Sequence, residues 1–549
     1  MNNATNSDNH GRGGSIDVQG NGTNITDCTF IQCSAYEGGV VYVNGTDVII
    51  NNCTSMMTSA LNGGAVYIMG DNVTVMKFKI SLSNATTSGG AMYILGVNAS
   101  ISECSFNITN AFGHTDDGGG AIFVMGNYTS ISKSNFTVTR ANYNNRAIGG
   151  AIYIQGDGVN VTDSNFNNTG ANLYGGAIYI AGENTTVKGS NFTNCTVNNG
   201  YGGAIYIIGA NTTVNKSEFK NCSSKYDGGA IYCHGENGQI LYSNFDDNIA
   251  YGGGGALYWE GGQAQDSIIG CTFNHNLANF SGGAVFWGYG GTGGLIQHSN
   301  FTNNIANAFR ETSTGSGGAI YWDQNIEGHI DNCSFINNSA LLLLGASGND
   351  VTGGQAGALF WDGVNGTIEN SYFANNTAHN THNTHSGGAI QWDAQGGLIN
   401  NVTFEYNQAK HGGAIAGTRS TDLVINGSTF KYNNATAGGA VWLESSERVN
   451  ITNTIFETNN AEYGGALYFN QNAVEPYFEN CTFDNNSAYQ AGAIYFKSDA
   501  NININSTING SYFYNNHVIE SNIKDKHAGA IYYAGRYHVL INSVFENNT

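Results

Sequence analysis

The segment Gly-Gly-Ala-Ile-Tyr at residues 149–153 decides the fold, because it recurs along the chain. The same five residues return at 175–179, 202–206 and 228–232. Variants that keep the aliphatic–aromatic pair extend the series from Gly38 to Gly529, and most successive copies lie about 25 to 30 residues apart. A second phrase, Ser-x-Phe-x-x-Asn-x-Ala, lies between the copies, as at 299–306. A period of this size indicates one supersecondary unit per repeat, stacked on its neighbours.

The residue types within a repeat predict strands rather than helices. They are β-branched and aromatic, they are separated by Gly and Asn turns, and they lack a 3.6-residue spacing. A unit of about 26 residues can hold three short strands and three turns. The sequence therefore predicts an all-β, right-handed parallel β-helix of about 19–20 turns. We expect one domain over residues 1–549, with a loop-bearing subregion at 255–415.

Columns of equivalent residues predict what lies inside the helix. The position after Ala is always aliphatic and should form one inner file, for example Ile152, Ile178, Ile205 and Ile231. The recurring Phe should stack inside likewise, and the Asn three residues later should form an amide ladder at an inner corner. The Gly pair indicates a turn that needs a positive φ or leaves no room for a Cβ.

The position two after Ala is aromatic in most copies, for example Tyr67, Tyr153, Tyr179, Tyr206, Tyr258 and Tyr321. Strand alternation predicts that this column faces outward. Two interpretations stay open. The rings either stack on one another as a structural ladder, which we favour, or they present an aromatic face that binds sugars or partners.

Composition narrows the class of protein. The 549 residues include 77 Gly and a single Pro, Pro476, as expected where nearly every backbone N–H donates to a sheet. Charged residues make up 11% and hydrophobic residues 40%, which argues against disorder. The net charge of −21 repels phosphate backbones, so nucleic acid is not an expected partner, and uronate polysaccharides are disfavoured as substrates.

The termini and the sequons suggest where the protein works. The chain has no apolar stretch long enough to span a membrane and no signal-peptide pattern after Met1. Since it also ends within a repeat, we expect a piece of a longer surface protein, attached to the cell envelope by a segment not present here. Roughly thirty Asn-x-Ser/Thr sequons fit glycosylation outside the cell. Five examples are Asn24, Asn107, Asn211, Asn300 and Asn485.

The ten cysteines do not follow a disulfide framework. Most occupy columns where Ser or Asn is the usual residue, so we expect small inward-facing fillers. Adjacent turns bring together Cys28 with Cys53 and Cys195 with Cys222, where spacing would allow a bond. Free thiols in an external protein would indicate an anoxic habitat.

The paired Gly-Gly-Ala-aliphatic and Phe-x-x-Asn phrases, from about Gly38 to Asn547, resemble two groups of proteins. One is the adhesin-like β-helix proteins of methanogenic archaea, and the other is the chlamydial polymorphic outer-membrane protein passengers. The Asn/Thr-rich, acidic composition is more similar to the archaeal group. The resemblance implies an extracellular, non-catalytic adhesin-like stalk that binds glycans or surface proteins of a host or a neighbouring cell.

The most individual region carries tryptophan three residues after Ala, followed in most turns by an acid. The same turns have extra residues near 307–315, 341–355 and 379–386, which should form a rim beside this strand. Aromatic faces beside carboxylates suit neutral carbohydrate, which predicts a ligand site. Strict alternation gives the alternative that the indoles face inward. The candidate residues are Trp259, Trp287, Trp322, Asp323, Trp361, Asp362, Trp392 and Asp393.

Other functions compete with this hypothesis. Polysaccharide lyases and hydrolases use the same architecture with carboxylates on one face, so Asp323, Asp362 and Asp393 also raise a catalytic alternative. A Ca²⁺ ion bridging two stacked carboxylates of this row is the cofactor we consider; no other is expected. The run His379, His382 and His385 offers weaker ligands for a transition metal. A structural filament unit, paired through strand edges, is a third alternative.

Overall fold

The computed structural model describes most of the chain. The described residues are 2–4, 11–113, 118–142, 146–261, 266–288, 290–308, 315–342, 354–379, 385–499, 502–519 and 528–549. They form two compact units, one of Met1–Gly252 with Ala256–Glu260, the other of Gly253–Gly255 with Gly261–Thr549. The single domain expected over residues 1–549 stays a prediction. All described elements are β-strands, and none of the described segments is a helix able to span a membrane.

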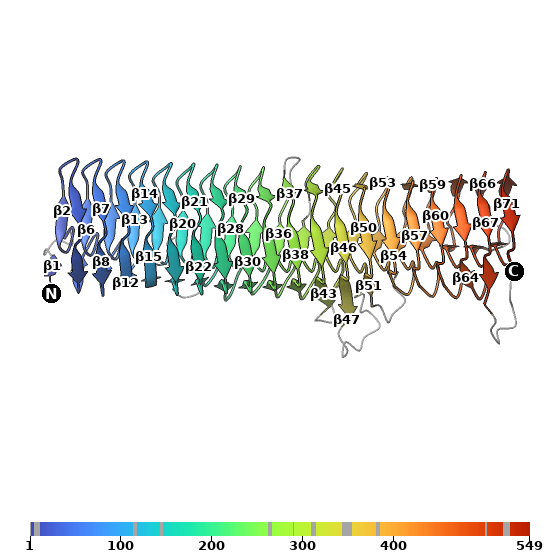
Figure 1. Cartoon of the computed structure of the whole chain (residues 1–549), viewed down its shortest axis with the longest axis horizontal. Coiled ribbons are helices and arrows are strands. Elements are labelled where there is room, and N and C mark those ends of the chain that lie inside the picture. Colours follow the sequence, from blue (N-terminus) through green and yellow to red (C-terminus); the bar gives the residue numbers. More distant parts are fainter. Residues whose placement is uncertain are drawn as a thin grey trace. The chain divides into compact units, whose positions relative to one another are not determined.

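In the first unit, the strand that follows Gly-Gly-Ala pairs in parallel with its equivalent in the next turn. These strands lie side by side in chain order in Figure 1, coloured blue to green. They are β2 (Ile16–Val18), β6 (Val41–Val43), β10 (Val66–Ile68), β13 (Met92–Ile94), β16 (Ile122–Val124), β20 (Ile152–Ile154), β24 (Ile178–Ile180), β28 (Ile205–Ile207), β32 (Ile231–Cys233) and β36 (Leu257–Trp259).

The second unit repeats the arrangement, again with parallel pairing between successive turns. Its equivalent strands are β40 (Val285–Trp287), β44 (Ile320–Trp322), β48 (Leu359–Trp361), β52 (Ile390–Trp392), β55 (Ile415–Thr418), β58 (Val441–Glu444), β61 (Leu467–Phe469), β65 (Ile494–Phe496) and β69 (Ile531–Tyr533). The all-β parallel β-helix predicted from the repeat is therefore confirmed.

One turn shows how the repeat is built. After β24 come β25 (Thr186–Lys188) and β26 (Asn191–Thr193), which are the three predicted strands. A fourth strand of two residues, β27 (Thr196–Val197), follows and was not predicted. Each strand pairs with its equivalents in neighbouring turns, so that backbone N–H and C=O groups are satisfied by stacking rather than within one repeat.

The predicted inner file exists. Ile152, Ile178, Ile205 and Ile231 pair directly with one another across β20, β24, β28 and β32, and all four are fully buried. The Phe column forms a second buried file, in which neighbouring rings lie parallel with centroids 4.7 Å apart, as for Phe166, Phe192 and Phe219. Apolar burial along both files is the main stabilising term of the turn.

The inner corner differs between the two units. In the second unit the predicted amide ladder is present: each Asn Nδ2 donates to the Oδ1 of the next Asn at 2.9–3.0 Å. Its members are Asn276, Asn304, Asn338, Asn376, Asn407, Asn433, Asn459, Asn486, Asn516 and Asn548. In the first unit the corner holds smaller groups in most turns, such as Thr58, Ser83 and Thr169, while Asn248 carries a buried amide.

The two glycines before Ala are needed for different reasons. Gly175 has φ +59°, and a Cβ there would lie 2.2 Å from the carbonyl oxygen of Ile178. At Gly176 the obstacle belongs to the next turn, since a Cβ would lie 2.0 Å from the carbonyl oxygen of Gly203. Both alternatives predicted for the pair are therefore correct, one at each position.

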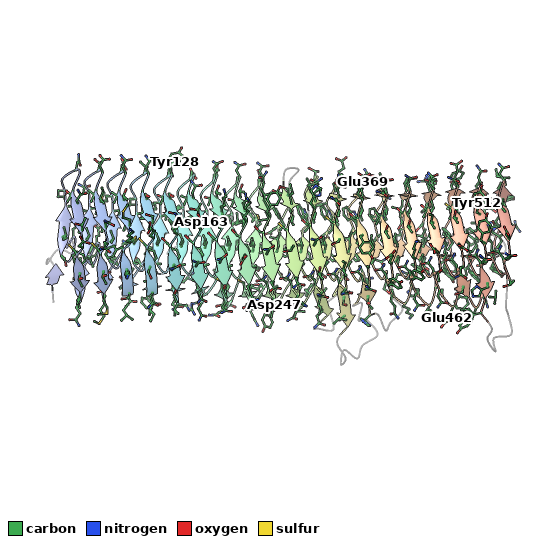
Figure 2. All side chains as sticks on the ribbon, in the orientation of Figure 1. Tyr128, Asp163, Asp247, Glu369, Glu462 and Tyr512 are labelled. Carbon is green, nitrogen blue, oxygen red and sulfur yellow. The ribbon has the colours of Figure 1, made fainter. Side chains whose placement is uncertain are left out.

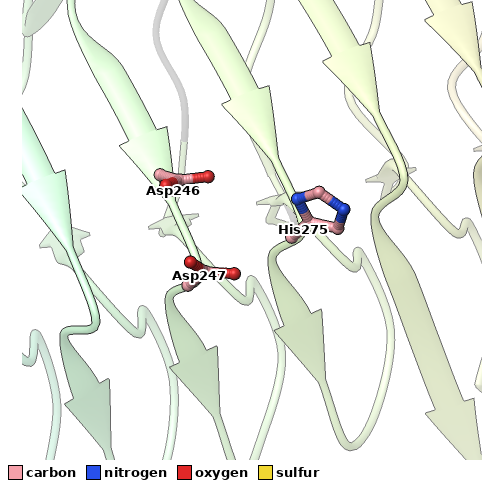
Figure 3. A group of neighbouring side chains, drawn as sticks. All are labelled: Asp246, Asp247 and His275. Atoms are coloured by element: carbon pink, nitrogen blue, oxygen red, sulfur yellow. The ribbon is translucent and has the colours of Figure 1, made fainter.

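Other corners use left-handed residues with side chains. Asp247 (φ 55°) follows β34 (Asn244–Asp246) in the first unit, and His275 (φ 53°) follows β38 (Thr272–Asn274) in the second; both are labelled in Figure 3. Asn and Asp tolerate this conformation best, which explains much of the Asn content of the sequence. An exposed side chain at such a corner points away from the strands, as Tyr128 does in Figure 2.

All ten cysteines are free thiols, and nine of them are buried. Cys104 illustrates the predicted filler role: its Sγ lies 3.3 Å from the carbonyl oxygen of Ser102 and 3.7 Å from that of Val75. The two pairs on adjacent turns, Cys28 with Cys53 and Cys195 with Cys222, are not bonded. The corner thiols therefore act as small polar fillers within the stack.

Candidate functional site

The tryptophan column lies inside the β-helix, which corrects the prediction that its rings contact a ligand. Trp259 in the first unit and Trp287, Trp322, Trp361 and Trp392 in the second are all 0% exposed. The four of the second unit stack in sequence, with centroid distances of 4.7, 4.6 and 5.3 Å. The physical reason is strand alternation: the residue two after the buried aliphatic position returns to the inner face.

Glycines make room for these indoles. A Cβ on Gly328 would lie 2.2 Å from Cζ2 of Trp322, and one on Gly366 would lie 2.1 Å from Cζ2 of Trp361. Gly397 stands in the same relation to Trp392, at 2.3 Å. In the sequence, a Gly follows each of these three Trp residues by five or six positions. This spacing indicates a packed indole only when the direction of the ring is known.

The acids that follow the tryptophans are the accessible members of this strand. Asp323, Asp362 and Asp393 are partly buried and lie on successive turns of the second unit. The backbone N–H of Asp362 donates to the carbonyl of Trp322 at 3.0 Å, and that of Asp393 to the carbonyl of Trp361 at 2.9 Å. In-register stacking of this kind places equivalent residues about 4.8 Å apart along the helix axis. The predicted acid row therefore exists without its aromatic partners.

The row is electrostatically strained. Burial raises the pKa of Asp362 to about 6, and the neighbouring carboxylates of Asp393 and Asp323 add to the shift. Burial also raises the pKa of Asp323. The pKa of the Tyr321 hydroxyl is raised by burial and by the same three carboxylates. Like charges this close disfavour simultaneous ionisation, so the row holds negative charge at a cost.

Asp393 is held by donors from two strands. Gln391 Nε2 donates to Asp393 Oδ1 at 2.7 Å, and Thr418 donates to the same oxygen through its backbone N–H at 3.2 Å and its hydroxyl at 2.7 Å. These three hydrogen bonds fix the orientation of the carboxylate. They also place a buried amide beside the acid row, which the sequence did not suggest.

Gln391 interrupts the outer aromatic column. It occupies the position held by Phe360 one turn earlier, and Ala416 occupies it one turn later. Both Gln391 and Ala416 are 0% exposed although they lie on the outward side of the strand. The side-chain oxygen Oε1 of Gln391 is buried and, within the described part of the chain, accepts no hydrogen bond. An unsatisfied amide oxygen in such a place is uncommon in a folded protein.

Two histidines pack beside this interruption. His385 Nε2 lies 2.9 Å from Glu444 Oε2, and its ring lies 4.3 Å from that of Trp442. The ring of His411 lies 5.1 Å from Trp442. Burial lowers the pKa of His385, while Glu444 and Asp393 oppose that shift. His385 precedes β52, and Glu444 and Trp442 belong to β58, so these contacts anchor the start of the β52 turn to a strand two turns further along.

The structure describes two of the three histidines of the predicted metal site. His379 is exposed, His382 lies outside the described residues, and His385 faces Glu444 as described. Among the described residues, neither His379 nor His385 belongs to a group of three His, Cys, Asp or Glu ligand atoms lying within 4.8 Å of one another. The same holds for Asp323, Asp362 and Asp393.

The predicted inserts begin as paired strands. β43 (Ile305–Ala308) and β47 (Ser339–Leu342) extend beyond the usual two residues and pair in parallel, with Asn307 opposite Leu341. Residues 309–314, 343–353 and 380–384 lie outside the described part of the chain. The bases of the first two inserts are therefore adjacent, and their tips stay a prediction.

The outer aromatic column is a structural ladder. In the first unit Tyr179, Tyr206 and Tyr232 stack with centroids 5.4 and 5.0 Å apart. Turn residues cover them from outside: Tyr174 packs on Tyr206 at 4.4 Å, and Tyr201 on Tyr232 at 5.0 Å. The ring-stacking interpretation is confirmed, and a continuous open aromatic face is not present among these residues because neighbouring rings and turns occupy it.

The five example sequons are accessible. Asn24, Asn107, Asn211, Asn300 and Asn485 are all exposed. Asn211 and Asn485 stand at corners with φ 55°. Exposure permits modification of these side chains, and glycosylation itself stays a prediction.

Two family models match parts of the chain. The model described as "Right handed beta helix region" matches residues 317–508, which include the acid row. The model of the Chlamydia polymorphic membrane protein repeat matches residues 298–321. The second match supports the resemblance to the chlamydial passengers, and the archaeal resemblance stays a prediction. No curated protein matches the sequence significantly.

Solved structures of three alginate lyases show distant likeness. The alginate lyase AlyF-OU02, solved as a complex, is 10% identical, with 87% of this chain and 86% of that chain covered and a TM-score of 0.29. A PL6 alginate lyase in complex with a trisaccharide is 11% identical, with 84% and 80% covered and a TM-score of 0.24. A mutant of another PL6 alginate lyase is 8% identical, with 97% and 96% covered and a TM-score of 0.20. TM-scores this low carry no functional argument. The structure is an all-β parallel β-solenoid, and the right-handed β-helix model matches its residues 317–508.

Proposed function

We propose that this chain is an extracellular, adhesin-like binding module of a cell surface, without catalytic activity of its own. The match to a polymorphic membrane protein repeat at residues 298–321 supports the surface location. The exposed sequons support it as well. In this role the β-helix is a scaffold, and specificity belongs to the turns that depart from the repeat.

The acid row is the observation that carries the proposal. The repeated aliphatic, Phe, Asn, Trp and Tyr columns are used in packing, and most are buried or stacked. Asp323, Asp362 and Asp393 are the exception, because they are partly buried acids on adjacent turns, and burial together with the two neighbouring carboxylates raises the pKa of Asp362 to about 6. Unfavourable charge retained beside inserted turns is a common mark of a binding surface.

The ligand class follows from charge and donor type. Carboxylates accept hydrogen bonds from sugar hydroxyls, so neutral glycans of a host or neighbouring cell suit the row. Surface proteins with basic patches are the second class of partner. The net charge of −21 opposes acidic glycans and nucleic acid.

A glycan array tests the proposal with two variants of equal charge. The first changes Asp323, Asp362 and Asp393 to Asn. The matched control changes Asp27, Asp163 and Asp247 to Asn, at exposed left-handed corners of the first unit that Asn also tolerates. We expect neutral-glycan binding to fall at least tenfold in the first variant only. Equal binding by both variants, or no glycan bound by the unchanged chain, would contradict the proposal.

A carbohydrate-active enzyme is the alternative, and one observation favours it. Asp362, with its pKa raised to about 6, lies beside Asp393, and a protonated and an ionised carboxyl side by side form the acid–base pair of many glycosidases. Release of reducing ends from neutral polysaccharides, lost in Asp362→Asn, would support this alternative. No release over a day at pH 5–7 would favour the binding module.

A further inference from the structure

The second unit carries two carboxylates on adjacent turns and a buried amide that contacts one of them. Asp362 follows β48 and Asp393 follows β52, and these strands pair in register, with Trp361 opposite Trp392. The two carboxylates therefore lie on adjacent turns, about 4.8 Å apart along the axis. Gln391 lies within β52, and its amide contacts Asp393 directly.

Gln391 distinguishes this place from an ordinary acidic surface. Its side chain is fully buried, and its Oε1 accepts no hydrogen bond from any residue that the structure describes. The same amide group donates Nε2 to Asp393 Oδ1 at 2.7 Å, so the oxygen lies within a few ångströms of the acid row. A buried amide oxygen without a partner is costly, and a cation would supply the missing partner.

We propose that Asp362, Asp393 and Gln391 Oε1 bind a Ca²⁺ ion. Two carboxylates and an amide carbonyl are hard oxygen donors, and Ca²⁺ completes its six to eight positions with water where the protein supplies few ligands. Neither nitrogen nor sulfur belongs to this donor set, which disfavours Zn²⁺ and Cu²⁺. Mg²⁺ fits less well because it demands near-ideal octahedral geometry.

The surroundings prepare the site. Thr418 donates its backbone N–H and its hydroxyl to Asp393 Oδ1, which holds the carboxylate in place before the ion arrives. Asp323, one turn before Asp362, adds negative charge that attracts a cation without being needed as a ligand. The ion would bind whether or not the chain binds glycans.

Titration calorimetry with CaCl₂ on the full chain tests the site directly. We expect one site with Kd on the order of 10⁻⁴–10⁻³ M, as in extracellular calcium modules. Asp362→Asn and Gln391→Met, which keep side-chain shape but remove a charge or the amide oxygen, should each weaken binding about tenfold or more. The control Asp163→Asn removes an equal charge from an exposed corner of the first unit and should bind as the unchanged chain does.

Terbium luminescence gives a second readout that depends on place. Tb³⁺ substitutes for Ca²⁺, and the buried indoles of Trp361 and Trp392, adjacent in sequence to the two acids, should sensitise its emission. We expect Ca²⁺ to displace the signal in the unchanged chain and the signal to be lost in Asp362→Asn. Circular dichroism confirms that each variant is folded. Ca²⁺ affinity equal in the chain and in Asp362→Asn, or no Ca²⁺ bound at 10 mM (about tenfold above the weaker limit), would overturn the proposal.

Discussion

Trp361 fits inside the second unit because Gly366 has no side chain. A Cβ on Gly366 would lie 2.1 Å from Cζ2 and 2.3 Å from Cε2 of the indole. The ring cannot retreat, since Trp322 and Trp392 stack on its two faces at 4.6 and 5.3 Å. The obstacle is a rigid, buried ring rather than the end of a flexible side chain.

Gly366→Ala should therefore destabilise the second unit by about 1–3 kcal/mol, the usual cost of overpacking. Guanidinium unfolding followed by tryptophan fluorescence measures the change. Gly20→Ala is the control, because its nearest neighbour is a hydroxyl oxygen 4.0 Å away and its φ is ordinary. A loss of stability equal in both variants would show that the indole does not confine this position.

The positions of some single residues could be predicted from the sequence, and those of others could not. The inner position of Ile152 follows from its own repeat, because strand alternation and hydrophobicity agree there. The burial of Gln391 does not, because it depends on neighbouring turns, such as the one where Ala416 occupies the equivalent position. Whether a residue of a repeat faces inward can be predicted from that repeat alone. Whether an outward-facing side chain is buried depends on the side chains of several turns.

At the scale of elements, the Asn ladder joins successive turns of the second unit. Asn407 Oδ1 accepts from the backbone N–H and Nδ2 of Asn376, both at 3.0 Å. Asn407 Nδ2 donates to the carbonyl of Phe373 and to Asn433 Oδ1, also at 3.0 Å. Each amide therefore satisfies groups of the turns on both sides, which no hydrophobic replacement can do.

Asn407→Ala should cost about 2–4 kcal/mol, since buried donors and acceptors on both sides lose their partners. Thermal and guanidinium unfolding measure the loss. Asn300→Ala is the matched control, because Asn300 is exposed on β42 (Asn300–Thr302) and should change stability by less than about 1 kcal/mol. If Asn407→Ala and Asn300→Ala have the same free energy of unfolding, the ladder contributes little to the stacking of turns.

The anchoring of β52's turn on β58 makes a prediction about pH. Burial lowers the pKa of His385, while Glu444 raises it in part. A pKa below the ordinary 6.5 means that folding favours the neutral ring, so this contact is stable above that pH and weakens as pH falls through the lowered pKa. Histidine NMR, assigned with His385→Gln, should give a pKa below 6.5.

Glu444→Gln should lower the pKa of His385 further, because it removes the attractive carboxylate 2.9 Å away. His379→Gln is the control, since His379 is exposed and should leave the titration of His385 unchanged. A pKa above 6.5 in the unchanged chain would mean that the ion pair outweighs burial and that acid strengthens the contact.

The same distinction holds for whole elements. The Phe and Asn columns could be predicted from the second phrase of the repeat, as could the left-handed glycine that precedes most of the Gly-Gly-Ala strands. The short fourth strand, such as β27, could not, because two residues carry no periodicity of their own. The acid row was predicted, but the tryptophans predicted to bind a ligand beside it face inward, since Trp and Asp alternate between the two faces of one strand.

At the scale of the whole molecule, in-register stacking explains the low content of charge. Equivalent residues of successive turns lie about 4.8 Å apart, so a charged column would bring like charges together along its length. Neutral Asn, Ser and Thr hydrogen-bond to their own equivalents instead, as Asn135, Asn165 and Asn191 do at 2.9 and 3.0 Å. Charged residues accordingly make up only 11% of the chain, and the acid row is an exception to this rule.

The distribution of thiols gives a test that covers both units. Nine of the ten cysteines are buried, and only Cys28 is partly exposed. Burial raises the pKa of Cys104, Cys333 and Cys481 to about 12, so their thiols stay protonated and enclosed at pH 8. Iodoacetamide should label Cys28 within minutes in the native protein and the other nine only after unfolding, as peptide mass spectrometry measures.

Because these folded pKa values exceed the unfolded value near 8.5, unfolding releases protons above that pH and stability should fall as pH rises toward 12. A Cys28→Ser variant that still takes up label in native buffer would show that the stacked turns open, and equal stability at pH 8 and 11 would contradict the burial of the thiols.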